Sequence, residues 1–159
     1  AKGLERKGLI KKVLVPMDGS GVAEQIIPHA EAFAEGLGGE LILFQAVGPV
    51  TAASTGEGYG FVTESTIREE NKRREKTSEQ YLDGVAKGLK ERGRTVSTHV
   101  AAGAPAEQIL DFAETHAMDV IAMSTHGRSG VSRWVFGSVT DKVLHAGDIP
   151  VLVVRATGQ

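Results

Sequence analysis

Short apolar runs alternate along the chain with longer segments in which apolar residues recur at helical spacing. Runs that are apolar on both faces are typical of buried strands in a parallel sheet. Such runs predict strands at residues 13–15, 41–47, 120–123 and 151–154, and residues 95–101 alternate enough to predict a fifth. The segments between them predict helices, at about residues 23–37, 63–92, 105–116 and 138–146. This alternation indicates the α/β class, with an open five-stranded parallel sheet, helices on both faces and right-handed crossovers.

Two of the predicted helices carry features of their own. Pro28 falls inside the first helical pattern and is expected to bend that helix, because proline lacks the N–H that an interior turn needs. The next helix opens with a charged stretch, residues 64–79, that holds five basic and five acidic side chains. Such a balance predicts a solvated helix face with local ion pairs, such as Glu69 with Arg73.

Length and composition restrict the class of protein. At 159 residues the chain is about one domain long, and we divide it into a basic tail at 1–10, a folded domain at 11–155 and a tail at 156–159. The net charge of −2 predicts no steering towards nucleic acid or membranes. No apolar run approaches the roughly 18 residues of a spanning helix. The chain has no cysteine, which excludes disulfides and fits a reducing, cytoplasmic setting.

The most concentrated signal for function follows the fourth predicted strand, between Ser124 and Ser138. Gly127 and Gly130 lack side chains, so backbone N–H groups there can approach a ligand closely, although the two glycines alone would also suit a tight turn. Gly137 opens a helix whose first amides have no partner within the helix and whose dipole favours an anion. The segment is neither a Walker A loop nor the G-x-G-x-x-G fingerprint. It predicts a phosphate site.

Three stretches carry a family resemblance: V-P-M-D at 15–18, a glycine at 127 followed after nine residues by G-S at 137–138, and P-V-L-V-V at 150–154. They resemble the universal stress proteins, and more narrowly the ATP-binding branch, whose motif is G-x2-G-x9-G-S/T. Ser124 stands where that motif has its first glycine. The resemblance covers almost the whole chain, from Lys11 to Arg155. It implies an adenine nucleotide α-hydrolase-like, Rossmann-like sheet with strand order 3-2-1-4-5.

The resemblance also implies which residues would contact ATP. Pro16 and Asp18 would lie near the adenosine, with Asp18 as the partner of a ribose or adenine polar group. The backbone of Leu41 would face the adenine edge, and Met123 and Ser124 would line the pocket floor. The phosphates would be held by Gly127, Arg128, Ser129, Gly130, Gly137, Ser138 and Val139. Mg²⁺ or Mn²⁺ would be held through the phosphates, without a dedicated protein cage.

The function that follows is that of an ATP-binding regulatory protein of the stress response, whose nucleotide state is read by an unidentified protein partner. ATP would order a loop at 48–60 or at 128–136. The alternative is a slow ATPase or a related nucleotide hydrolase, but no general base is visible: His126 has no carboxylate nearby in sequence and is interpreted as a turn residue. A phosphoryl-accepting receiver domain is excluded, because residues 101–103 hold no acceptor aspartate after the third strand.

The last predicted strand indicates a homodimer. Its residues, 151–154, form an uninterrupted apolar run near the end of the chain, and the last strand of such a sheet lies at an edge. An exposed apolar edge favours aggregation unless another segment covers or pairs it. Two copies related by a twofold axis could pair these strands antiparallel, and the family resemblance points the same way. The alternative is a strand shielded by the loop after the second strand or by the N-terminal tail.

Overall fold

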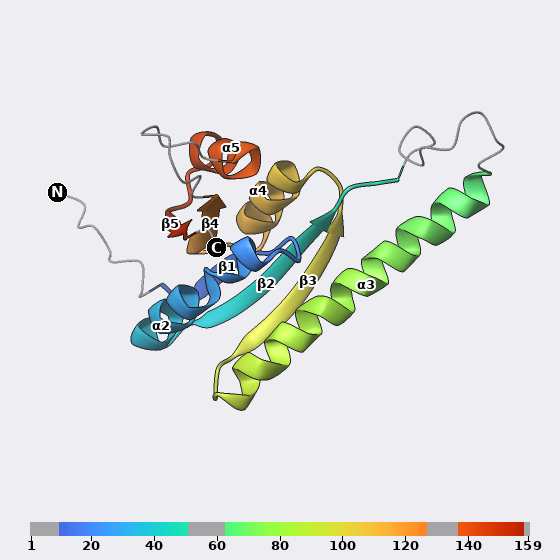
Figure 1. Cartoon of the computed structure of the whole chain (residues 1–159). Helices are drawn as coiled ribbons and strands as arrows, with labels where there is room; N and C mark the ends of the chain where they lie inside the picture. Colours follow the sequence, from blue (N-terminus) through green and yellow to red (C-terminus); the bar gives the residue numbers. More distant parts are fainter. Residues whose placement is uncertain (1–9, 51–62, 127–136, 158–159) are drawn as a thin grey trace.

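The five strands form one sheet in the order β3-β2-β1-β4-β5, and every neighbouring pair is parallel (Figure 1). The computed structural model describes residues 10–50, 63–126 and 137–157. The strands are β1 (Lys12–Pro16), β2 (Glu40–Val47), β3 (Val96–Ala102), β4 (Val120–His126) and β5 (Val151–Ala156). This arrangement confirms the predicted α/β class and the strand order 3-2-1-4-5.

Helices cover both faces of the sheet, because successive side chains of each strand point to opposite faces. Val13 and Val15 of β1 pack with α2 and α3, whereas Leu14 between them packs with α4 and α5. The result is three layers with a hydrophobic core on each side of the sheet. The helices are α1 (Gly21–Glu24), α2 (Ile27–Leu37), α3 (Glu64–Glu91), α4 (Pro105–Thr115) and α5 (Ser138–Ala146).

The first predicted helix is two helices rather than one bent helix. Pro28 lies in the first turn of α2, where its missing N–H costs no intrahelical bond. α1 ends at Glu24, and α2 begins at Ile27, directly before the proline. Gly38 then ends α2 with a left-handed φ of 62°, a conformation that glycine adopts without strain.

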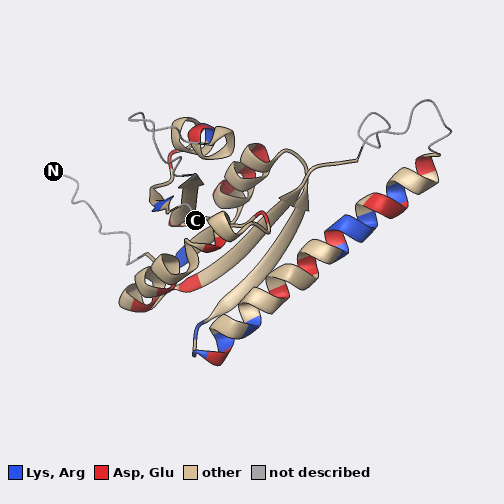
Figure 2. Ribbon diagram, in the orientation of Figure 1, with Lys and Arg blue, Asp and Glu red and all other residues tan. Residues whose placement is uncertain are grey.

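The charged stretch of α3 is an exposed helix face, with both signs of charge along it (Figure 2). The predicted partner of Arg73 is wrong, because its guanidinium binds Glu70 and not Glu69. Nε and Nη2 of Arg73 donate to the two carboxylate oxygens of Glu70 at 3.0 and 2.9 Å. Two parallel bonds across three residues satisfy the fork geometry of arginine. Within the described ranges, no helix combines the length and the apolar content needed to cross a membrane.

Candidate functional site

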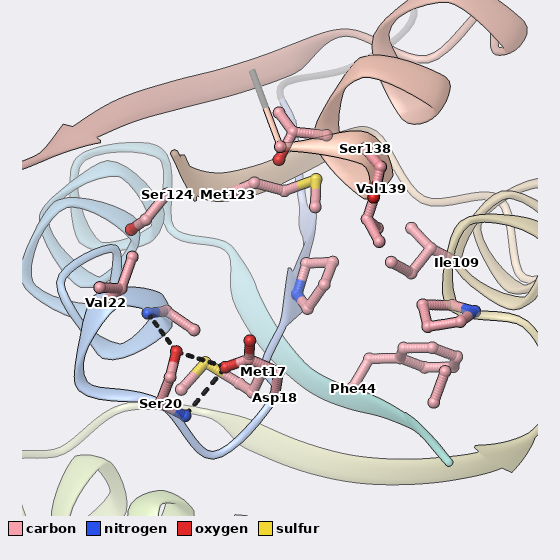
Figure 3. Close-up of a pocket in the computed structure, with 16 residues that line it drawn as sticks. Met17, Asp18, Ser20, Val22, Phe44, Ile109, Met123, Ser124, Ser138 and Val139 are labelled. Carbon is pink, nitrogen blue, oxygen red and sulfur yellow. Dashed lines mark hydrogen bonds between the residues drawn. The ribbon is translucent and has the colours of Figure 1, made fainter. Parts of the chain in front are cut away.

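A cavity of about 310 Å³ opens at the carboxyl ends of β1 and β4 (Figure 3). The strand order reverses between these two neighbours, and ligands of open parallel sheets bind at such a point. Six elements contribute to the wall: the end of β1, α1, the carboxyl halves of β2 and β4, and the first turns of α4 and α5. The lining residues are Pro16, Met17, Asp18, Ser20, Val22, Ala23, Phe44, Ala46, Pro105, Ile109, Met123, Ser124, Gly137, Ser138, Val139 and Thr140.

One side of the cavity is polar, and its centre is the turn after β1. Gly19 has a φ of 82°, which glycine accepts without strain and which lets the chain turn sharply. Across that turn, the N–H and the hydroxyl of Ser20 both donate to Oδ1 of Asp18, at 2.9 and 2.6 Å. The second carboxylate oxygen of Asp18 points towards the middle of the cavity in Figure 3. The turn therefore presents a hydrogen-bond acceptor to a ligand.

The start of α5 forms another part of the wall. Gly137 is its N-cap residue, and no side chain caps the helix there. A Cβ built on Gly137 would meet no atom of the described residues within 4 Å, so these residues leave room above this turn. The first amides of a helix have no partners within the helix, and the dipole makes this end positive. The start of α5 can therefore hold an anionic group.

The opposite side of the cavity is apolar. Phe44 of β2 is fully buried beneath it, and Ile109 of α4 and Val139 of α5 lie around the same space in Figure 3. Ala46 and Pro105 complete this side. Apolar walls with a few convergent polar groups are typical of small-molecule sites. This combination suits a ligand with a flat ring at one end and polar, anionic groups at the other.

Ser124 lies at the carboxyl end of β4, where it contributes to the cavity. Its Oγ atom exposes less than 1 Å² and has no hydrogen-bond partner in the described parts of the chain. Buried hydroxyl groups without partners are uncommon, and each costs free energy. A polar ligand group that reached Ser124 would remove that cost.

A second hollow of about 500 Å³ adjoins the first and shares Asp18 and Ala46 with it. It lies beside α3, where Arg73 is bound to Glu70 and Arg74 donates from Nη1 to the carbonyl oxygen of Gly48 at 2.9 Å. Asp18 therefore stands at the boundary of two cavities. Only the first of them also contains the start of a helix.

The structure brings together seven of the residues that the resemblance pointed to: Pro16, Asp18, Met123, Ser124, Gly137, Ser138 and Val139. Leu41 does not line this cavity. Leu41 lies near the amino end of β2, is 1% exposed within the core, and its N–H donates to the carbonyl oxygen of Thr95 at 2.9 Å. Ala46, at the carboxyl end of the same strand, lines the cavity instead. The predicted contacts at Gly127, Arg128, Ser129 and Gly130 lie outside the described residues.

Sequence reasoning missed several residues that line the cavity, above all Ser20, Val22, Phe44 and Ile109. For β2 a signal was available: ligands bind outside the carboxyl ends of parallel strands, which favours Ala46 over Leu41. Ser20 also had a signal, because a serine two residues after an aspartate often closes a turn onto it. Phe44 and Ile109 had none, since only the packing of α4 on β2 brings them together.

Comparisons with known proteins agree on one family. The model of the universal stress protein family matches residues 9–155. Universal stress protein MJ0531 of Methanocaldococcus jannaschii is 31% identical over 94% of this chain and 84% of its own length. The solved structure of MJ0577 from the same organism superimposes with a TM-score of 0.77, at 28% identity, over 95% of this chain and 99% of that one. A universal stress protein from Archaeoglobus fulgidus, solved in complex with dAMP, has the same fold, with 20% identity, a TM-score of 0.60 and coverage of 91% and 98%.

Proposed function

The chain belongs to the universal stress protein family, and we propose that it binds ATP in the cavity at the carboxyl ends of β1 and β4. The observation that carries this proposal is the division of that cavity. Its wall combines an apolar part, around Phe44, with two polar features, Asp18 and the start of α5, where no side chain caps the helix. The dAMP complex of the Archaeoglobus fulgidus protein supports an adenine nucleotide as the ligand of this fold.

The division of the cavity also supports one orientation of the nucleotide. The adenine ring suits the apolar side, between Phe44 and Ile109. Asp18 would then accept hydrogen bonds from the ribose, and the phosphates would lie at the amides of Ser138 and Val139. The Oγ of Ser124, which has no hydrogen-bond partner among the described residues, is a further polar group available to the nucleotide. The family motif adds Gly127, Arg128, Ser129 and Gly130 as further phosphate ligands.

Mg²⁺ or Mn²⁺ would accompany the phosphates rather than occupy a separate protein site. Among the described residues, no group of three or more His, Cys, Asp or Glu side chains could hold a metal ion. Magnesium usually keeps several waters and is bound through phosphates and one or two carboxylates. In this proposal the metal therefore depends on ATP for its binding.

The nucleotide-bound protein would act as a cytoplasmic regulator of the stress response, in the form of a homodimer. β5 lies at the edge of the sheet. The N–H of Ile121 donates to the carbonyl oxygen of Pro150, and Ile121 is in register with Val151. In a parallel ladder the bonding residues alternate, so the backbone groups of Val151 and Val153 point away from β4. Because these groups point away from β4, they support antiparallel pairing with a second copy. A protein partner would read the nucleotide state of that dimer.

Calorimetric titration of the purified protein with ATP, GTP and CTP tests this function, together with mass analysis of any small molecule that co-purifies with it. We expect saturable binding of ATP, tighter than that of GTP and CTP by about tenfold or more, which corresponds to about 1.4 kcal/mol. Equal binding of the three nucleotides, or no saturable binding of ATP, would overturn the proposal.

A further inference from the structure

Ser20 makes three short hydrogen bonds at the polar side of the cavity (Figure 3). Its N–H and its hydroxyl donate to Oδ1 of Asp18 at 2.9 and 2.6 Å, and its Oγ accepts the N–H of Ala23 at 3.1 Å. The same side chain thus binds the carboxylate of Asp18 and caps α1. Because Ser20 and Ala23 also line the cavity, this chain of bonds fixes a part of its wall.

The two bonds from Ser20 end on the same oxygen of Asp18. An ionised carboxyl group has two oxygens and only accepts hydrogen bonds. With Oδ1 occupied, Oδ2 is left for a ligand, and Figure 3 shows it directed to the middle of the cavity. Two bonds on one oxygen also restrict rotation of the carboxyl group. The acceptor is therefore held in one direction before a ligand arrives.

A ribose ring offers the complementary groups, because its 2′- and 3′-hydroxyls are donors on neighbouring carbons. We infer that Ser20 is a positioning residue that holds Asp18 for the hydroxyls of a ribose, so that the cavity selects adenine ribonucleotides over their deoxy forms. This inference rests on the proposed binding of ATP. It narrows the proposed ligands to adenine ribonucleotides, and it assigns a role in binding to Ser20, which lies outside the family motif.

A cap of α1 is the simpler role for Ser20, and affinity for ATP alone would not separate the two roles. Loss of a cap would disturb α1 and weaken the binding of every nucleotide by the same factor. Loss of the bond to Asp18 would instead remove the discrimination between a ribose and a deoxyribose. A ratio of affinities is therefore the measurement that distinguishes a positioning residue from a cap.

The experiment is calorimetric titration of the whole chain with ATP, 2′-dATP and 3′-dATP, for the wild type, Ser20→Ala and Ser20→Thr. Hydrogen bonds to charged groups are strong enough that the wild type should prefer ATP over at least one deoxy form by about 10- to 100-fold. Ser20→Ala should reduce that preference to below about threefold. Ser20→Thr keeps the hydroxyl and should retain it.

If Ser20→Ala does not fold, Ser20→Gly replaces it, since glycine at an N-cap costs only a few tenths of a kcal/mol. Equal affinity of the wild type for all three nucleotides overturns the inference while the proposed function stands. An unchanged preference in the folded Ser20→Ala or Ser20→Gly protein overturns it as well. If the wild type binds none of the three nucleotides, the proposed function itself has failed.

Discussion

The side-chain amide of Gln25 binds both backbone groups of Thr157. Nε2 of Gln25 donates to the carbonyl oxygen of Thr157 at 3.2 Å, and Oε1 accepts its N–H at 3.0 Å. Gln25 follows α1, which lines the cavity, and Thr157 follows β5. The pair therefore connects a wall of the cavity to the end of the edge strand, two parts of the molecule that are far apart in the sequence.

Gln25→Ala should loosen the end of the chain after β5 without unfolding the domain. Both bonds are exposed, and each contributes about 1 kcal/mol. Loss of the bond to the Thr157 N–H should therefore accelerate hydrogen exchange of that amide about fivefold. Gln25→Glu is the matched control, because a carboxylate still accepts from the Thr157 N–H but no longer donates. Amide exchange measured by NMR decides the matter. An unchanged rate in Gln25→Ala would show that the pair does not hold the chain end.

Glu31 should make the stability of the protein depend on acid pH. Its carboxylate accepts hydrogen bonds from Arg92 at 3.0 and 2.9 Å and from Arg94 at 3.0 Å. Arg92 above all, and then Arg94, lower the pKa of Glu31 from 4.5 to about 2. A pKa that is lowered in the folded state stabilises the protein above pH 4.5, and this contribution is lost as the pH falls from 4.5 towards 2.

The free energy of unfolding should therefore fall by about 1 kcal/mol over that pH range on account of Glu31, after allowance for solvent screening of the half-exposed Arg92. Glu31→Gln should be less stable than the wild type at pH 7 and should have a flatter pH profile. Glu107→Gln, which changes an exposed carboxyl group of α4, is the control. Urea denaturation at several pH values measures this. Parallel profiles for wild type and Glu31→Gln would contradict the assignment.

The free edge of β5 predicts a dimer that one proline can disrupt. Val153 directs its N–H away from β4, so Val153→Pro should remove a bond across the interface and leave the β4–β5 ladder intact. Sedimentation equilibrium should find a dimer for the wild type and a mass near 16.8 kDa for the variant. Thr98→Pro, on the opposite edge strand β3, is the control and should stay dimeric, because the N–H of Thr98 likewise points away from the neighbouring strand. A folded Val153→Pro protein that remains fully dimeric places the interface elsewhere.

ATP turnover should be far below the 1–100 s⁻¹ that is typical of kinases. Asp18 is the single titratable side chain among the described residues that line the cavity, and Ser20 occupies one of its oxygens. None of the other described residues that line the cavity can share proton transfer with it. Steady-state phosphate release measures this. A turnover within the kinase range that is abolished by Asp18→Asn would make the protein an ATPase.

The layers of the fold could be predicted from the sequence, because the strands carry apolar runs, or alternate as β3 does, and the longer helices carry an apolar stripe. Pro28 shows the limit of that reasoning. A proline inside a helical pattern predicts that the helix is interrupted or bent, but the sequence does not show which. The structure shows two helices, with α1 packed beside β4. The place of Gly137 and Ser138 at the cavity could be predicted because these residues are consecutive and open a helix after the fourth strand. The apolar end could not, since Phe44 and Ile109 meet only through tertiary packing.

The central claim is that the start of α5 holds the phosphates of ATP, and Gly137→Val tests it most directly. Gly137 has a φ of −59°, and a Cβ there meets none of the described residues within 4 Å. The fold should therefore accept valine, while the side chain fills the space of the phosphates. Gly84→Val, an equally open position on α3 outside the cavity, is the control.

The decisive measurement is the Kd of ATP, by calorimetric titration, for wild type, Gly137→Val and Gly84→Val proteins whose thermal unfolding shows that they are folded. Loss of one or two charge-assisted bonds should weaken ATP binding by about 10- to 10⁴-fold in Gly137→Val, and Gly84→Val should bind like the wild type. An unchanged Kd in Gly137→Val would contradict the placement of ATP at α5.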